Sequence, residues 1–280
     1  QFNKKGNLDD HLLKDLSTSG VPKELKNTVF PFKYGDYKKF SQIIKKQKIG
    51  IVKMEVARNM LANHKFLKFI RQACTKKKII LIFDECTSGF RQNFGGMHKI
   101  LKIIPDIAVF GKSLGNGFAI TAVIGRKKIM DSSKTSFISS TFWSERVGYV
   151  AALETLNQME KLKTWKKLSK LGIYCRKKLE ELSKKNSIDV DVKGLLAIPS
   201  FVLKNDKNNI LKTYITQEML KKGFIINNAI YLCVYHNKKI LNKFFIVLDE
   251  IFKTIKNTPI NKIKKLLLSK ESMSGFGRLN

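Results

Sequence analysis

Short apolar runs alternate with segments of helical periodicity in the first half of the chain. Continuous apolar runs of this kind, above all the isoleucine-rich Ile79–Phe83, are typical of strands covered on both faces of a sheet. Four runs predict strands: Ile49–Met54, Ile79–Phe83, Ile107–Phe110 and Ala119–Gly125. Helices are predicted over Tyr37–Lys46 and over His64–Lys76, where apolar residues have helical spacing. Strands that alternate with helices favour an α/β fold.

The pattern changes behind Ser144, which is a candidate N-cap. From Glu145 to Lys184 apolar residues recur every three or four positions, which predicts one long helix, or two with a break near Gly172. Further along the chain, the pattern predicts strands at Leu195–Leu203 and Phe224–Tyr235. It predicts helices at Ile210–Lys222 and Lys239–Lys256. We therefore expect two domains, an α/β domain over residues 1–160 and a smaller α+β domain over 161–280.

Composition and charge exclude a disordered protein but do not decide between an enzyme and a nucleic-acid-binding protein. With 43% hydrophobic and 27% charged residues, the 280-residue chain is typical of globular proteins and unlike disordered ones. The formal net charge is +32, from 54 basic and 22 acidic residues. Most basic residues are lysines spread along the whole chain, which favours a compositional bias over a nucleic-acid-binding patch. A basic nucleic-acid-binding protein stays open as an alternative.

The cysteines and histidines predict neither a metal site nor a disulfide framework. Both residue types are widely scattered, and the four cysteines form no CxxC pair: Cys74, Cys86, Cys175 and Cys233. This usage favours a reducing compartment, so we expect a cytoplasmic protein. The longest apolar runs are far shorter than the roughly 20 residues of a membrane-spanning helix.

Polar residues end two of the predicted strands. Asp84 and Glu85 follow one strand, and Gly111 and Lys112 follow the next. Ligands in open α/β sheets bind just beyond strand ends, although a plain ion pair is the alternative for an acid and a lysine there.

Nucleotide binding is excluded, because each of the two known nucleotide-binding motifs lacks a required glycine in this sequence. The phosphate loop of ATPases would require glycine at Asp106, and a dinucleotide fingerprint would require it at Ile120.

Three motifs in order carry a specific resemblance: LIFDECTSGFR, PDIAVFGKSLGNGFAITAVIG and FISSTFWSE. Together they resemble the class III aminotransferase family of pyridoxal-phosphate enzymes, which includes the glutamate-1-semialdehyde 2,1-aminomutases, and the resemblance extends through the closing GFGRLN. It implies a fold-type-I transferase fold of the aspartate-aminotransferase kind, with a mixed, mostly parallel sheet. Residues 1–160 would be the rear part of the large cofactor-binding domain, and residues 161–280 the small C-terminal domain.

The resemblance also implies roles for four residues. Asp84 matches the aspartate beneath the pyridine nitrogen of the cofactor, where a carboxylate keeps that nitrogen protonated. Lys112 matches the lysine that forms the Schiff base and then moves the proton. Cys86 falls where the family usually has a branched apolar residue against the ring. Thr141 matches the threonine that the neighbouring subunit offers to the cofactor phosphate. The family's phosphate-binding loop and ring-stacking aromatic residue would lie upstream of Gln1.

The function implied is a pyridoxal-phosphate-dependent transfer of an amino group from a donor to a carbonyl acceptor, or a shift of one within a substrate. A homodimer with shared active sites is implied too, and FISSTFWSE would then lie at its interface. The alternatives are that this motif fills the core below the long helix, and that the chain is an inactive fragment which only dimerises. Arg91 and Arg146 are candidates to bind a substrate carboxylate, with structural ion pairing as the alternative.

Overall fold

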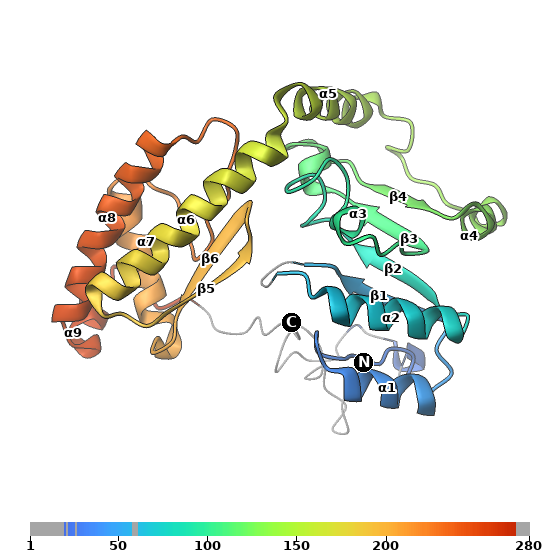
Figure 1. The fold of residues 1–280 in the computed structure, drawn as a ribbon, viewed down its shortest axis with the longest axis horizontal. Helices are drawn as coiled ribbons and strands as arrows, with labels where there is room; N and C mark the ends of the chain where they lie inside the picture. The colour runs from blue at the N-terminus through green and yellow to red at the C-terminus, as the bar shows by residue number, and fades with distance from the viewer. Residues whose placement is uncertain (1–19, 21, 26, 58–60, 273–280) are drawn as a thin grey trace.

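The computed structural model describes residues 20, 22–25, 27–57 and 61–272, so the closing motif GFGRLN lies outside the described residues. The described chain forms two lobes (Figure 1). The first is built around a four-stranded sheet and the second around a hairpin packed on helices, and a long helix runs from one to the other. The predicted boundary between residues 160 and 161 stays a prediction.

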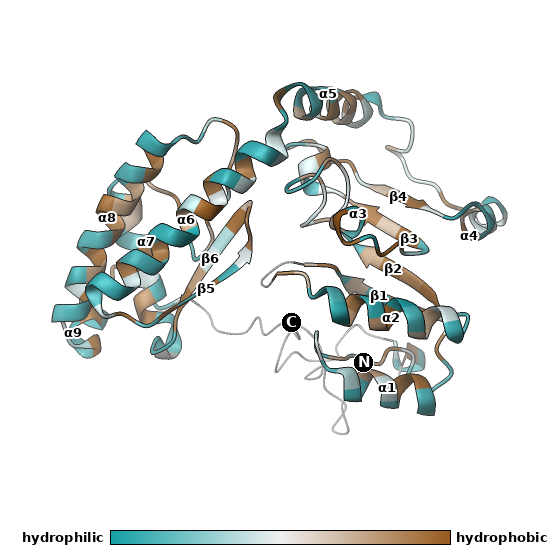
Figure 2. Ribbon diagram, viewed as in Figure 1, coloured by the Kyte–Doolittle hydropathy of each residue, from teal (hydrophilic) through white to brown (hydrophobic). Residues whose placement is uncertain are grey.

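The sheet has the order β1–β2–β3–β4, which is the order of the strands along the chain. Its strands are β1 (Ile51–Glu55), β2 (Ile80–Asp84), β3 (Ile107–Phe110) and β4 (Ala122–Gly125). The first three are parallel and β4 is antiparallel to β3. The predicted mixed, mostly parallel sheet is therefore confirmed, and Figure 2 shows β2 and β3 in the brown of apolar residues.

Two helices of the first lobe have the predicted bounds, α1 (Tyr37–Lys46) and α2 (His64–Lys76). The Asn63 side chain starts α2 by accepting a hydrogen bond from the Phe66 N–H at 3.1 Å. Phe66 and Ile70 then pack in one hydrophobic cluster with the buried residues of β2. The short helices α3 (Met97–Leu101) and α4 (Lys127–Met130) were not predicted, because a helix of four or five residues is too short to display a helical period in its sequence.

The two faces of β2 differ in burial. Leu81 and Phe83 are fully buried, whereas Ile80, Ile82 and Asp84 on the opposite face are only half-buried. The strand is therefore not fully covered on both faces by the described residues, contrary to the prediction. Asp84 lies on the more accessible face.

The predicted long helix is two helices, α5 (Arg146–Leu162) and α6 (Thr164–Asn186). The break lies at Lys163, whose φ is 47°, and not near Gly172. Gly172 is inside α6, where an added Cβ would lie 1.8 Å from the Leu196 carbonyl oxygen, so glycine allows the helix to touch the hairpin. The N-cap of α5 is Glu145 rather than Ser144, since its carboxylate accepts the Val147 N–H at 2.7 Å.

The second lobe packs a two-stranded hairpin against helices, among them α6 and α7 (Ile210–Lys221). The predicted strand Leu195–Leu203 is the turn and second strand of this hairpin, and the predicted strand Phe224–Tyr235 is not a strand. The latter segment still runs beside the hairpin, with an Ile230 N–H to Pro199 oxygen bond of 2.8 Å. The elements are β5 (Val190–Leu195), β6 (Ile198–Leu203), α7 (Ile210–Lys221), α8 (Lys238–Asn257) and α9 (Ile260–Lys265). Both α7 and α8 confirm predicted helices. Figure 2 shows teal and brown bands alternating along α6 and α8, as expected of amphipathic helices.

Candidate active site

Asp84 and Lys112 follow neighbouring parallel strands at the same edge of the sheet. Asp84 is the last residue of β2 and pairs in register with Val109 of β3. Lys112 comes two residues after Phe110, the last residue of β3. The strand ends therefore carry a carboxylate and a primary amine to one edge, as the sequence predicted.

The Asp84 carboxylate is held by two donors. It accepts a hydrogen bond from the Cys86 N–H at 3.1 Å, and the Lys53 ammonium of β1 lies 3.2 Å away. Burial alone would raise the pKa of Asp84, but the hydrogen bond from Cys86 and the charge of Lys53 outweigh it, so the pKa lies below its ordinary value. Asp84 is thus a carboxylate at neutral pH.

Lys112 sits in a constrained turn and contacts a residue that the sequence did not single out. Its φ is 50°, in the left-handed region that costs a non-glycine residue about 1–2 kcal/mol. Its Nζ donates a hydrogen bond to Thr87 Oγ1 at 2.7 Å. Backbone strain of this kind is concentrated at functional sites. The sequence gives no signal for Thr87, because its hydrogen bond with Lys112 depends on the pairing of β2 with β3 in the folded sheet.

Cys86 joins Asp84 and Lys112 in one cluster. A Cβ added to Gly111 would lie 3.6 Å from Cys86 Sγ, so this thiol lies against the turn that carries Lys112. Burial and then the negative charge of Asp84 raise the pKa of the Cys86 thiol, while Lys112 acts in the opposite direction. The thiol stays neutral and can serve as a small apolar surface. Three of the four predicted residues are therefore brought together.

A buried Glu85 fixes the loop that carries this cluster. The side chain is fully buried and accepts four hydrogen bonds, from Ser88 Oγ at 2.6 Å, the Met97 and His98 N–H groups at 2.9 Å, and His98 Nδ1 at 2.8 Å. Burial would raise the pKa of Glu85, but these hydrogen bonds outweigh it and lower the pKa. Four donors on one carboxylate hold residues 85–98 in a single arrangement beside Asp84.

Thr141 does not join the cluster within its own chain. It is exposed and lies in the segment between α4 and α5 (Figure 1). The aromatic residues around it are exposed as well, Phe137 by 99% and Phe142 by 77%. The alternative that FISSTFWSE fills the core below the long helix is therefore wrong for the described chain. The motif forms an apolar surface.

A cavity between the two lobes reaches Lys112. The first lobe contributes Phe90, Arg91 and Lys112 to its lining, and the second contributes Thr164 and Tyr231. The loop after β2 contacts the hairpin of the second lobe here, since Gln92 Oε1 accepts the Leu196 N–H at 2.7 Å. Asp84, Cys86 and Thr141 do not line this cavity, so it extends from the Lys112 side of the cluster.

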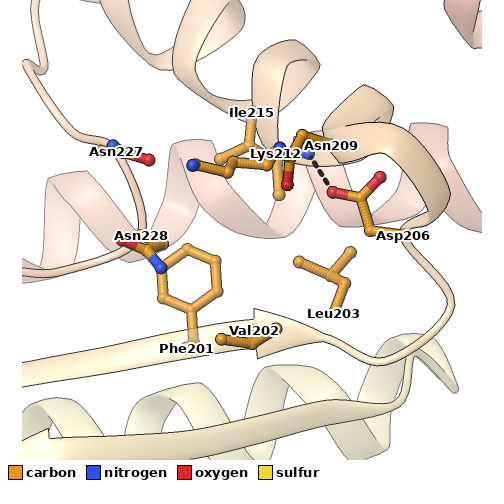
Figure 3. A pocket seen from close by; sticks show the side chains of 9 residues that line it. All are labelled: Phe201, Val202, Leu203, Asp206, Asn209, Lys212, Ile215, Asn227 and Asn228. Atoms are coloured by element: carbon orange, nitrogen blue, oxygen red, sulfur yellow. Dashed lines mark hydrogen bonds between the residues drawn. The ribbon is translucent and has the colours of Figure 1, made fainter. Parts of the chain in front are cut away.

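A separate small cavity in the second lobe shares no lining residue with the first (Figure 3). Its Asp206 carboxylate accepts the N–H groups of Leu211 and Lys212, each at 2.8 Å. Because these two bonds close the first turn of α7, Asp206 has a structural role.

Within residues 20, 22–25, 27–57 and 61–272, no three His, Cys, Asp or Glu side chains are placed to hold a metal ion, and no helix is long and apolar enough to span a membrane.

Solved transaminase structures share this fold. The FumI protein of Sphingopyxis sp. MTA144, solved in its PLP internal aldimine form, aligns with a TM-score of 0.80 at 22% identity, covering 90% of this chain and 64% of its own. An omega-transaminase from Sphaerobacter thermophilus aligns with a TM-score of 0.76 at 21% identity, covering 86% of this chain and 60% of its own. The fold is that of the fold-type-I pyridoxal-phosphate enzymes, as predicted.

The sequence comparisons identify the family. The model of the family Aminotransferase class-III matches residues 59–249. A glutamate-1-semialdehyde 2,1-aminomutase from Fusobacterium nucleatum is 32% identical over 264 residues, covering 85% of this chain and 59% of the relative. A 3-aminobutyryl-CoA aminotransferase from Cloacimonas acidaminovorans is 26% identical over 227 residues, covering 78% and 54%. This chain belongs to the class-III aminotransferases, a family of pyridoxal-phosphate-dependent enzymes, and spans somewhat more than half the length of these two relatives.

Proposed function

We propose that the whole protein is a pyridoxal-phosphate-dependent enzyme that transfers an amino group between small molecules or shifts one within a molecule. The observation that carries the proposal is the cluster of Asp84, Cys86 and Lys112 at the ends of two parallel strands. The relatives of this chain include one named aminotransferase and others named aminomutase, and both reactions stay open for this protein. A cytoplasmic location also stays a prediction from the sequence.

The chemistry of these side chains fits the cofactor. Pyridoxal phosphate, when bound, supplies a ring that accepts the electrons left by a departing proton. The ionised Asp84 is suited to hold a proton on a pyridine nitrogen, and the neutral Cys86 thiol is suited to lie against a ring. Lys112 offers the primary amine for attachment, and its Nζ is then able to accept and return a proton.

A visible absorbance band tests this function. Adding pyridoxal phosphate to the whole protein should produce a band that persists through desalting, because Lys112 attaches the cofactor covalently. The band should disappear when a donor amine is added and return with a carbonyl acceptor. A whole protein that gives no band would refute the proposed function, whereas a band from the whole protein but not from residues 1–280 alone would support the alternative that this chain is an inactive fragment. Nanomolar, sequence-selective binding of a DNA duplex at physiological salt would instead revive the nucleic-acid alternative.

We further propose that the active protein is a homodimer in which Thr141 serves the site of the other subunit. The support is the exposed apolar surface formed by Phe137, Phe142 and Trp143, the last of them 59% exposed. It continues onto α5 through Val147 and Val150, which are also more than half exposed. An apolar surface of this kind is typical of an interface.

Mixing two inactive variants tests the shared site. In a dimer of one Lys112→Ala subunit and one Thr141→Ala subunit, one site carries both changes and the other carries neither. Activity should therefore rise above that of either parent, measured after co-refolding. A mixture of Lys112→Ala and Asp84→Asn is the matched control, since both residues serve their own chain and no intact site forms. If the first mixture stays as inactive as the control although mixed dimers form, Thr141 does not act across the interface.

A further inference from the structure

The small cavity in the second lobe has an apolar floor. It lies between β6, α7 and residues 227–228, and its volume is about 120 Å³. Phe201, Leu203 and Ile215 line it, and each of these side chains is 7% exposed or less. One water molecule takes up about 30 Å³ in the liquid, so the cavity has room for a small organic molecule. An alkyl group that enters it leaves water for an apolar surface.

Three polar side chains at the rim of this cavity have no partner. Lys212, Asn227 and Asn228 line it, and their side chains make no hydrogen bond or ion pair with the other described residues. Figure 3 shows the Lys212 side chain extending above the apolar floor toward Asn227. One ammonium and two amide groups therefore offer N–H donors to a molecule in the cavity.

The charge of the lining favours an anion. Asp206 and Lys212 are the charged residues among the described ones that line the cavity. The Asp206 carboxylate already accepts two backbone N–H groups of α7, and it faces the positive end of that helix, which offsets its charge. The Lys212 ammonium extends away from Asp206 in Figure 3, and no ion pair joins the two groups. The positive charge of Lys212 is thus the one that a ligand can neutralise.

The apolar floor narrows the class of anion. Inorganic phosphate would place some of its oxygens against Phe201 and Ile215, which donate no hydrogen bond, and an unpaired polar group is costly to bury. A carboxylate with a short alkyl chain avoids this cost. Its oxygens accept a charge-assisted hydrogen bond from Lys212 and further bonds from the amides, while the chain covers the floor.

We propose that this cavity binds a short-chain monocarboxylate of about the size of butyrate, with the carboxylate on Lys212, Asn227 and Asn228. The cavity shares no lining residue with the one that reaches Lys112. A ligand held here is therefore not the substrate of amino transfer, and the proposal stands or falls independently of the proposed function.

A titration of the whole protein with butyrate, followed by NMR of its isoleucine and leucine methyl groups, tests this site. The methyl resonances of Leu203 and Ile215 should shift until they saturate. Lys212→Met should weaken the affinity about tenfold or more, as expected when a charged hydrogen bond is lost. Lys221→Met is the matched control and should bind butyrate unchanged, since Lys221 lies on the same helix but does not line the cavity. Butylamine, which carries the opposite charge on a similar chain, should cause no shift.

Each other outcome contradicts the proposal. The site is refuted if butyrate leaves the Leu203 and Ile215 resonances unchanged, or if Lys212→Met binds it as tightly as Lys221→Met. Inorganic phosphate that bound as tightly as butyrate would show that the apolar floor has no role, and the assignment of a monocarboxylate would be wrong. Should Lys212→Met not fold, Asn227→Ala at an exposed position replaces it, and its affinity should then fall a few-fold through the loss of a neutral donor. An unchanged affinity in that variant would refute the site as well.

Discussion

Replacing Lys112 with alanine is expected to lower the amino-transfer rate of the whole protein by about 10³-fold or more. The Lys112 amine is presented by a strained turn at the end of β3, beside the ionised Asp84 carboxylate. Under the proposed function, alanine removes both the point of attachment of the cofactor and the group that moves the proton. The rate of amino transfer from a donor amine to a carbonyl acceptor, measured with pyridoxal phosphate in excess, gives the loss.

Borohydride reduction followed by peptide mapping identifies the attachment residue independently of activity. A pyridoxyl label should appear on the peptide that contains Lys112 and on no other lysine of the chain. Lys127→Ala is a suitable control, because Lys127 begins α4, which has no buried residues, and does not line the cavity that reaches Lys112. A label on another lysine would refute the assignment of Lys112, whatever the activity of the variant.

Local patterns predicted most of the sheet and of the longer helices. The bounds of α1, α2 and β3 follow from apolar spacing within each segment, and in α2 and β3 the buried residues recur with the period of the element. The break between α5 and α6 could not be predicted in the same way, because Lys163 adopts a left-handed conformation without a glycine or proline nearby. Gly172, which suggested a break, instead serves a contact with Leu196 far along the chain.

The cluster of Asp84, Cys86 and Lys112 was predicted through motifs, whereas its surroundings required the structure. The contacts of Thr87 with Lys112, and of Arg91 with Tyr231, join residues that are distant in sequence. Nothing in the local pattern marks such pairs. The buried Glu85 network likewise depends on His98, which looked like an isolated histidine in the sequence.

Replacing Asp84 with asparagine is expected to preserve cofactor binding while lowering turnover by about 10²–10³, the effect of removing one electrostatic contribution of about 2.7–4 kcal/mol at a reacting centre. Asparagine has nearly the same shape and is still able to accept the Cys86 N–H, but it is neutral and no longer favours a proton on a pyridine nitrogen. The measurement is the rate of the half-reaction at saturating donor, together with the intensity of the visible band.

Lys53→Met provides the matched comparison for Asp84→Asn. Lys53 is the ion-pair partner of Asp84, but its side chain is 60% exposed, and exposed ion pairs typically contribute about 0–1 kcal/mol. We therefore expect Lys53→Met to change turnover by only a few-fold. The hydrogen bond from Cys86 and the charge of Lys53 hold the pKa of Asp84 below its ordinary value. In the unaltered protein, Asp84 should therefore stay ionised at a pH equal to the ordinary pKa of aspartate, so that lowering the pH to that value does not reproduce the effect of Asp84→Asn. An Asp84→Asn protein with turnover as high as Lys53→Met would show that the charge of Asp84 has no role in the reaction.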